Sequence, residues 1–184
     1  MVVILIIVAL IVLFVIVGVS LYNGLVKKRN MMQEAWSGID VFLKKRYDLI
    51  PNLVNTVKGY AGHEKQLLEQ VTSLRTQAMQ SGSVEQKISA EKELGPALGR
   101  LMVSVEAYPD LKANQNFRDL QAQLTTIEGE LEMARRYYNG TVRENNIAVE
   151  SFPGNIVAGS FKFDKGVFFE IDNTQQRETP NVSF

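Results

Sequence analysis

The residues with the clearest potential for catalysis surround the single histidine of this 184-residue chain. His63 is followed by Glu64, so a metal-dependent or acid–base site would have to use this pair. A zinc site of the H-E-x-x-H type needs a second histidine four residues later on the same helical face, and that position holds Leu67. A serine hydrolase of the Gly-x-Ser-x-Gly type would need a turn that the sequence does not contain. We therefore expect no catalytic or metal-binding residues, and an enzyme built on His63 and Glu64 is the weaker hypothesis.

The amino-acid composition excludes several kinds of functional site. The chain has no cysteine, which excludes disulfides, thiolate zinc sites, iron–sulfur clusters and thiol nucleophiles. Its 20 basic and 20 acidic residues give a net charge of zero, so there is no electrostatic reason to expect nucleic acid as a partner. The sequence predicts a protein without cofactors.

The N-terminal stretch determines where the rest of the chain is placed. Residues 2–21 contain one polar side chain, Ser20, and no charge. A helix of 20 residues is about 30 Å long, which matches the hydrocarbon thickness of a bilayer. Residues 1–22 are therefore predicted to form a transmembrane anchor. A cleaved signal peptide is the alternative, but the stretch lacks a basic n-region and an A-x-A cleavage site, and it exceeds the usual apolar h-region.

Basic residues follow this anchor and none precedes it. Lys27, Lys28 and Arg29 lie in a juxtamembrane basic segment, residues 23–30, and a basic excess beside a spanning helix tends to stay in the cytoplasm. We therefore expect a single-pass protein of the bacterial inner membrane with its N-terminus outside and its body cytoplasmic. Tyr22 suits the aromatic belt of the interface, so Tyr22 and the three basic residues are the predicted lipid contacts.

Two features near the anchor permit weaker interpretations. The Asn-Gly pair at positions 23–24 is a candidate hinge between anchor and body. A second basic cluster, Lys44, Lys45 and Arg46, is interleaved with acidic residues. We interpret it as a solvated face of the body, because it lies about 25 Å beyond the first cluster along a helix.

Three stretches carry apolar residues at the three-to-four-residue spacing of an amphipathic helix. The first covers residues 31–78 and resumes directly after Pro51, which predicts a kink instead of an end. The second covers residues 84–106, where Gly95-Pro96 would bend or split it, and the third covers residues 110–148. These patterns predict an all-α fold, with a single N-terminal transmembrane helix followed by an elongated antiparallel helical bundle over residues 31–152.

The C-terminal region is predicted to be a short irregular or hairpin tail. Residues 153–172 form a segment rich in phenylalanine, in which Phe161, Phe163, Phe168 and Phe169 flank a turn-like sequence at residues 164–166. These rings either pin the segment to the bundle or form a patch for a partner or a lipid surface, and they are our first choice for self-association through the soluble body. Residues 173–184 are polar and are predicted to be a mobile tail.

Asparagines near the end of the third pattern are the remaining polar candidates. Asn139 and Asn145 lie there, and the heptad count places Asn145 at a core-facing position. Polar groups in a helical core must be hydrogen-bonded, so we expect a structural polar network. A ligand pocket at this place, which would make the protein a ligand-sensing bundle, is the alternative.

Several long motifs carry a resemblance to a known family. They lie at residues 35–41 (AWSGIDV), 45–54 (KRYDLIPNLV), 57–64 (VKGYAGHE) and 106–113 (EAYPDLKA). With these motifs in this order, the chain resembles the LemA family of bacterial membrane proteins. Family members often have a lysine or two before the anchor, and this sequence has none.

The resemblance implies a single-span anchor, an antiparallel helical bundle and no established catalytic site. Some members are encoded near a membrane metalloprotease, which implies envelope quality control and a membrane protease as a candidate partner. We expect a non-catalytic, membrane-anchored scaffold or interaction protein, self-assembling as a homo-oligomer, that acts in quality control or in membrane organisation. Its other expected partner is membrane lipid.

Overall fold

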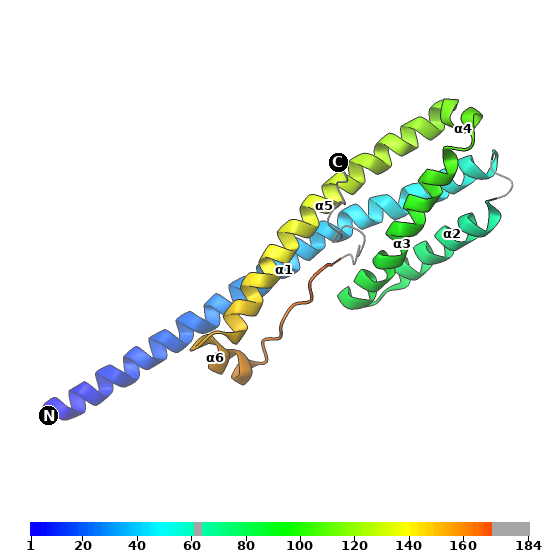
Figure 1. Cartoon of the computed structure of the whole chain (residues 1–184). Coiled ribbons are helices and arrows are strands. Elements are labelled where there is room, and N and C mark those ends of the chain that lie inside the picture. Colours follow the sequence, from blue (N-terminus) through cyan, green and yellow to red (C-terminus); the bar gives the residue numbers. More distant parts are fainter. Residues whose placement is uncertain (61–63, 171–184) are drawn as a thin grey trace, which may run out of the picture. The chain divides into compact units, whose positions relative to one another are not determined.

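Helices make up most of the described part of the chain. The structure, a computed structural model, describes residues 1–60 and 64–170. Its helices are α1 (Val2–Lys58), α2 (Lys65–Gln80), α3 (Val84–Val105), α4 (Pro109–Ala113), α5 (Gln115–Glu150) and α6 (Gly154–Phe161) (Figure 1). Within the described residues there is no β-strand, so the predicted all-α fold is confirmed. The predicted mobile tail, residues 173–184, lies outside this part of the chain.

The chain divides into two compact units. One unit contains Met1–Phe42 and Glu130–Phe168, and the other contains Leu43–Gly129 together with Phe169 and Glu170. The two long helices α1 and α5 each contribute residues to both units. We call the first the anchor unit and the second the bundle unit.

The N-terminal part of α1 is long and apolar enough to cross a membrane, and none of its most apolar stretch is buried. The helix passes through Asn23 and Gly24 without a break, so the candidate hinge is not a helix end. It also includes Pro51, which removes only one backbone hydrogen bond. The first fully buried side chain of α1 is that of Leu25.

The first predicted helical pattern is two helices in the structure. The expectation of one kinked helix over residues 31–78 is wrong, because α1 ends at Lys58 and α2 begins at Lys65. Gly59 follows the last helical residue, and glycine in a helix interior costs about 1 kcal/mol relative to alanine. The apolar spacing continues through the break because α2 buries its own stripe within the same unit.

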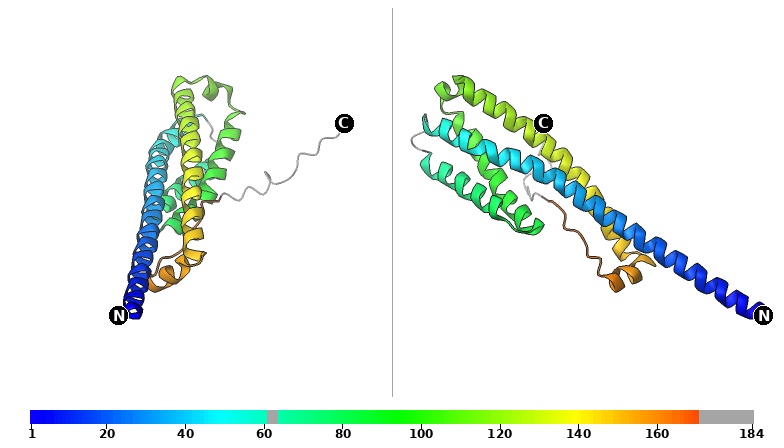
Figure 2. Two further views of the ribbon diagram at one scale, coloured as in Figure 1. Left: turned by 90° about the vertical axis from the view of Figure 1, so that its left-hand side faces the viewer. Right: turned by 180° about the vertical axis from the view of Figure 1, so that it is seen from behind.

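The bundle unit packs four helical segments in antiparallel order: the end of α1, then α2, α3 and the start of α5 (Figures 1 and 2). Its buried apolar side chains come from all four segments. Among them are Leu43, Ile50, Leu53 and Val57 from α1, Leu68, Val71 and Leu74 from α2, Ile88, Leu94, Leu98 and Leu101 from α3, and Phe117 and Leu124 from α5. These positions follow the predicted helical spacing, so one stripe of each segment faces the core.

Side-chain caps determine where α3 and α5 begin. The Ser83 hydroxyl accepts a hydrogen bond from the Gln86 amide (3.2 Å), and the Gln86 side chain accepts one from the Gly82 amide (3.0 Å). The Asn114 side chain likewise accepts a hydrogen bond from the Phe117 amide (3.1 Å). The third predicted helix, residues 110–148, is therefore divided at Asn114, because this residue ends α4 and caps α5.

In the anchor unit, α1 and α5 lie side by side in opposite directions (Figure 2). Lys28 pairs with Glu144 (3.1 Å), whereas Trp36, farther along α1, contacts Tyr138, which precedes Glu144 in α5. The Trp36 and Tyr138 rings meet edge to face at 5.3 Å between centroids. Residues later in α1 thus contact residues earlier in α5, which shows that the two helices are antiparallel.

A charged network lies in the core of the bundle unit. Arg46 and Glu91 are each 1% exposed and form an ion pair, and Arg46 also pairs with Glu128 (2.9 Å). The Tyr47 hydroxyl donates a hydrogen bond to Glu91 (2.5 Å), and Arg75 donates one to the Tyr47 carbonyl (2.7 Å). The prediction that the second basic cluster is a solvated face is wrong for Arg46, although Lys44 and Lys45 are exposed. Arg46 continues the inward-facing row of α1, and this spacing was the signal in the sequence.

The buried ion pair gives a stability prediction. Arg46→Met leaves the Glu91 carboxylate buried without its cation, which lowers the free energy of unfolding by about 3–5 kcal/mol. Glu91→Leu lowers it less, because Arg46 keeps Glu128. The double variant loses less than the sum of the two single losses, measured by denaturant unfolding of the full chain in detergent.

Lys45→Met is the matched control, because Lys45 is the exposed neighbour of Arg46 on the same helix. This control changes stability by less than about 0.5 kcal/mol. Strictly additive losses in the double variant would show that Arg46 and Glu91 do not stabilise each other.

Candidate functional site

The predicted lipid contacts lie on α1 directly after its apolar part. Lys27 is exposed, and Lys28 is half-buried in its ion pair with Glu144. The guanidinium of Arg29 lies over the ring of Phe163, 5.1 Å from its centroid, in a cation–π contact. Two of the three basic side chains are therefore partly engaged within the anchor unit.

An aromatic cluster lies beside these basic residues. The ring of Tyr22 meets Phe161 edge to face at 4.9 Å and Phe163 at 5.6 Å between centroids. The structure thus brings together two sets that the sequence analysis keeps apart, the lipid contacts and part of the phenylalanine segment. We call Tyr22, Arg29, Phe161 and Phe163 the aromatic–basic cluster.

The four phenylalanines of the C-terminal segment have different environments. Phe163 and Phe169 are buried at 6% and 3% exposure, because they pack inside the protein. A partner therefore cannot contact these two rings as the structure stands. Phe161 and Phe168 are 61% and 38% exposed, and they remain available. Self-association through the soluble body stays a prediction.

The helix α6 replaces the predicted hairpin. Residues 154–161 are helical, and residues 162–170 continue without strand pairing, so only the irregular alternative holds after the helix. Gly154 permits the corner between α5 and α6, because a Cβ there would lie 2.5 Å from the Ala148 carbonyl oxygen. Lys162 ends α6 in the left-handed conformation (φ 53°), with its amide donating to the Ala158 carbonyl. Eight residues are too few for periodicity to reveal a helix.

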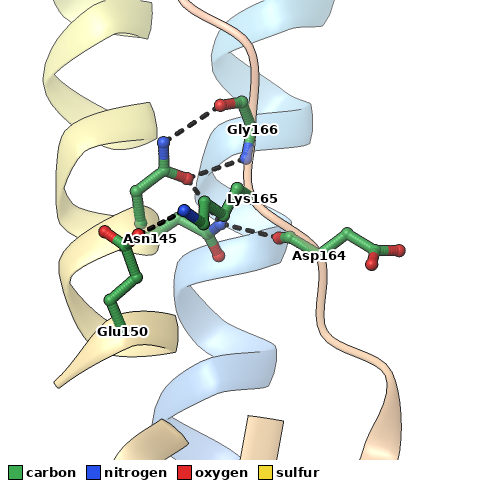
Figure 3. A network of polar contacts seen from close by, with 6 residues as sticks. Asn145, Glu150, Asp164, Lys165 and Gly166 are labelled. Carbon is green, nitrogen blue, oxygen red and sulfur yellow. Dashed lines mark hydrogen bonds and ion pairs between the residues drawn. The ribbon is translucent and has the colours of Figure 1, made fainter. Parts of the chain in front are cut away.

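An extended segment, residues 162–168, follows α6 and is tied to α5; we call it the strap (Figure 3). The Asn146 side chain makes two hydrogen bonds to Gly166, donating to its carbonyl (3.0 Å) and accepting from its amide (2.7 Å). The Tyr138 hydroxyl donates to the Val167 carbonyl (2.9 Å), and Lys165 forms an ion pair with Glu150. Side chains of α5 therefore satisfy the strap backbone in place of a neighbouring strand.

The strap also passes close to α1. An ideal Cβ on Gly166 would overlap the sulfur of Met32, so a larger residue here would require the Met32 side chain or the strap to move.

The two asparagines predicted to form a polar network lie on this side of α5. Asn145 is 1% exposed, and its amide donates to the Asp164 carbonyl (3.2 Å). Asn139 is half-buried on the same helix. The residue that contributes most to the strap is Asn146, whose role was not predicted because its partner Gly166 is 20 positions away.

An apolar groove lies between α1 and α6. It has a volume of about 420 Å³. It is lined by Phe14, Val15, Gly18, Val19 and Tyr22 from α1 and by Val157 and Phe161 from α6. The groove therefore continues from the aromatic–basic cluster along the apolar part of α1.

The enzyme hypothesis uses His63 and Glu64, and only Glu64 lies within the described residues. His63 lies outside the described residues, and Glu64 is half-buried directly before α2. Among residues 1–60 and 64–170, no group of three or more histidine, aspartate or glutamate side chains is arranged to hold a metal ion.

The strap gives a second prediction. Asn146→Ala removes both hydrogen bonds to Gly166, which favours local opening of the strap by about 1–3 kcal/mol, or roughly 5- to 150-fold faster amide exchange there. Hydrogen–deuterium exchange of the full chain measures this for the peptide containing Gly166. Arg143→Ala, at an exposed position of α5, is the control and leaves that exchange unchanged. Equal exchange in both variants would contradict the role assigned to Asn146.

Comparisons with known proteins agree on one family. The family model described as the LemA family matches residues 35–184, which begins after the apolar part of α1. The chain is 26% identical over 166 residues to protein LemA of Metamycoplasma hominis, covering 89% of this chain and 75% of the relative. It is 24% identical over 175 residues to magnetosome protein MamQ 2 of Paramagnetospirillum magneticum, covering 81% of this chain and 64% of the relative.

Magnetosome protein MamQ of Magnetospirillum gryphiswaldense is 22% identical over 174 residues, covering 80% of this chain. The matched region spans 64% of that relative, so the chain covers less than two thirds of the magnetosome relatives. The family model, which matches most of the chain, decides the assignment: the protein belongs to the LemA family.

Proposed function

We propose that this protein is a non-catalytic, membrane-anchored scaffold that organises other components at a bacterial membrane. The observation that carries this proposal is the exposure of the apolar part of α1. Its side chains from Val2 to Val17 are 44–80% exposed wherever they are large and apolar, although the same helix is packed from Leu25 onward.

The exposed apolar side chains of α1 need an apolar medium around them. A core helix of a soluble protein buries its apolar side chains, and here none of the most apolar stretch is buried. Apolar surface left in water costs about 25 cal/mol of free energy per Å². In a bilayer, each Val, Ile or Leu near the helix centre instead favours insertion by about 0.3–0.6 kcal/mol. The surrounding medium that satisfies this surface is lipid hydrocarbon.

The rest of the chain supports a structural role. The buried polar groups of the bundle unit, such as Arg46 and Glu91, bind one another and are therefore occupied with holding helices together. The names of the magnetosome relatives describe a cellular structure and no reaction, and the description of the LemA family likewise names no reaction. A scaffold in membrane organisation is the role that these observations support best.

Membrane extraction tests the anchor. The full chain stays with membranes during alkaline carbonate washing, whereas Ile7→Arg combined with Ile11→Arg releases a substantial fraction. Each arginine near the helix centre costs about 2.5–3.5 kcal/mol of insertion free energy, which offsets the gain from several apolar residues. Gln121→Arg with Gln123→Arg is the control, since it adds the same charges at exposed positions of α5. Complete release of the unmodified chain would refute the anchor.

We also propose that the body lies in the cytoplasm. Its support is the excess of basic residues after the apolar segment, where Lys27, Lys28 and Arg29 all fall within a few turns of its end. Lys27 is exposed on α1, as a head-group ligand needs to be.

Cysteine accessibility tests this orientation, because the natural chain has no cysteine. Gly82→Cys places a thiol in the exposed loop before α3 and leaves the Ser83 cap intact. This thiol resists a membrane-impermeant maleimide in intact cells and reacts after lysis. Val2→Cys, at the opposite end of the apolar segment, is the control and reacts without lysis. The reverse pattern would place the body outside.

A further inference from the structure

We infer that α6 is a second membrane-contacting element, an interfacial helix embedded in the lipid leaflet beside α1. This inference rests on the proposed anchoring of α1. It adds an element that the apolar N-terminal segment alone does not reveal.

The depth of α6 follows from the residues that it faces. Val157 and Phe161 of α6 line the groove together with α1 residues from Phe14 to Tyr22. At about 1.5 Å per residue, Phe14 lies about 12 Å from Tyr22 along the helix axis, toward the middle of the spanning segment. If residues 2–21 span the hydrocarbon, the side of α6 that faces α1 lies at or below the level of the acyl-chain boundary.

The chemistry of α6 suits this depth. No residue from Gly154 to Phe161 is charged. Ile156 and Phe161 are each 61% exposed, and Phe152 just before the helix is 80% exposed. The hydroxyl of Ser160 donates to the Ile156 carbonyl (2.8 Å), so that polar group is satisfied within the helix. Exposed apolar side chains on a short uncharged helix are unfavourable in water and favourable among acyl chains.

Basic side chains border α6 on the side of the strap. Lys162 is exposed and directly follows the helix, and Arg29 lies over Phe163. Cationic groups next to an apolar surface match the order of a leaflet, in which phosphate head groups lie outside the hydrocarbon. Tyr22 lies between the apolar part of α1 and these basic residues, and it has the amphipathic ring typical of the membrane interface.

The groove between α1 and α6 then has one occupant, an acyl chain of a phospholipid. Its lining is apolar apart from the Tyr22 hydroxyl, and a Cβ on Gly18 would meet nothing within 4 Å, so the groove is open at that point. Because the groove lies at hydrocarbon depth, acyl chains are the apolar molecules present there at high concentration. A protein segment or a second copy of the chain in the groove would exclude lipid.

Fluorescence quenching by lipids brominated on their acyl chains tests this placement. Trp36 is the only tryptophan, so the Trp36→Phe chain provides a background without tryptophan that keeps an aromatic ring against Tyr138. Single tryptophans are introduced there as Ile156→Trp or Phe161→Trp, both at exposed positions. The full chain is reconstituted in phosphatidylcholine vesicles with or without brominated lipid, and circular dichroism verifies its helix content.

We expect brominated lipid to lower the emission of both α6 tryptophans and to leave Val41→Trp unchanged. Val41 is exposed on α1 about 28 Å beyond Tyr22, out of reach of the acyl chains. Phe14→Trp reports on the anchor itself and is quenched if α1 spans the bilayer.

Quenching at position 14 without quenching at positions 156 and 161 would overturn the inference and leave the anchor standing. A protein segment that covered the groove and α6 would give this same pattern of quenching. Absence of quenching at position 14 would refute the anchor and, with it, the placement of α6.

Discussion

The change of environment along a single helix is the constraint on which the anchor unit depends. α1 is apolar on all sides at its N-terminal end, and from Leu25 onward it buries only one side. No loop separates the two parts of the helix, so under the proposed anchoring the elements beside this change meet both hydrocarbon and water. The aromatic–basic cluster and the uncharged helix α6 suit that proposed placement, with rings and apolar side chains on one side and cations on the other.

The strap shows how the anchor unit holds a segment without regular structure of its own. An extended chain outside a sheet has backbone amides and carbonyls without a neighbouring strand to pair with. Asn145 and Asn146 supply partners from α5, and Tyr138 adds a hydroxyl, so the backbone is satisfied without a second strand. Since the strap begins where α6 ends, these hydrogen bonds also limit where α6 can lie.

In the bundle unit, a buried ion pair takes a place that an apolar pair would otherwise fill. Such a pair is weak evidence for added stability, because removing two charges from water offsets much of their attraction. Its partners are specific, however: Arg46 of α1 reaches Glu91 of α3 and Glu128 of α5. A shift of one helix along another would leave a buried charge unpaired, which favours a single alignment of the three helices.

The sequence by itself determined the features that depend on local pattern. A long uncharged stretch and apolar residues at helical spacing are local signals, so the long apolar N-terminal helix, the all-α fold and the start of α3 were predictable. Only the tertiary structure decided which acidic residues pair with Arg46, the helix α6 against α1 and the strap on Asn146. Each depends on partners brought together from distant parts of the chain, and spacing along a single helix carries no information about which partner will be opposite.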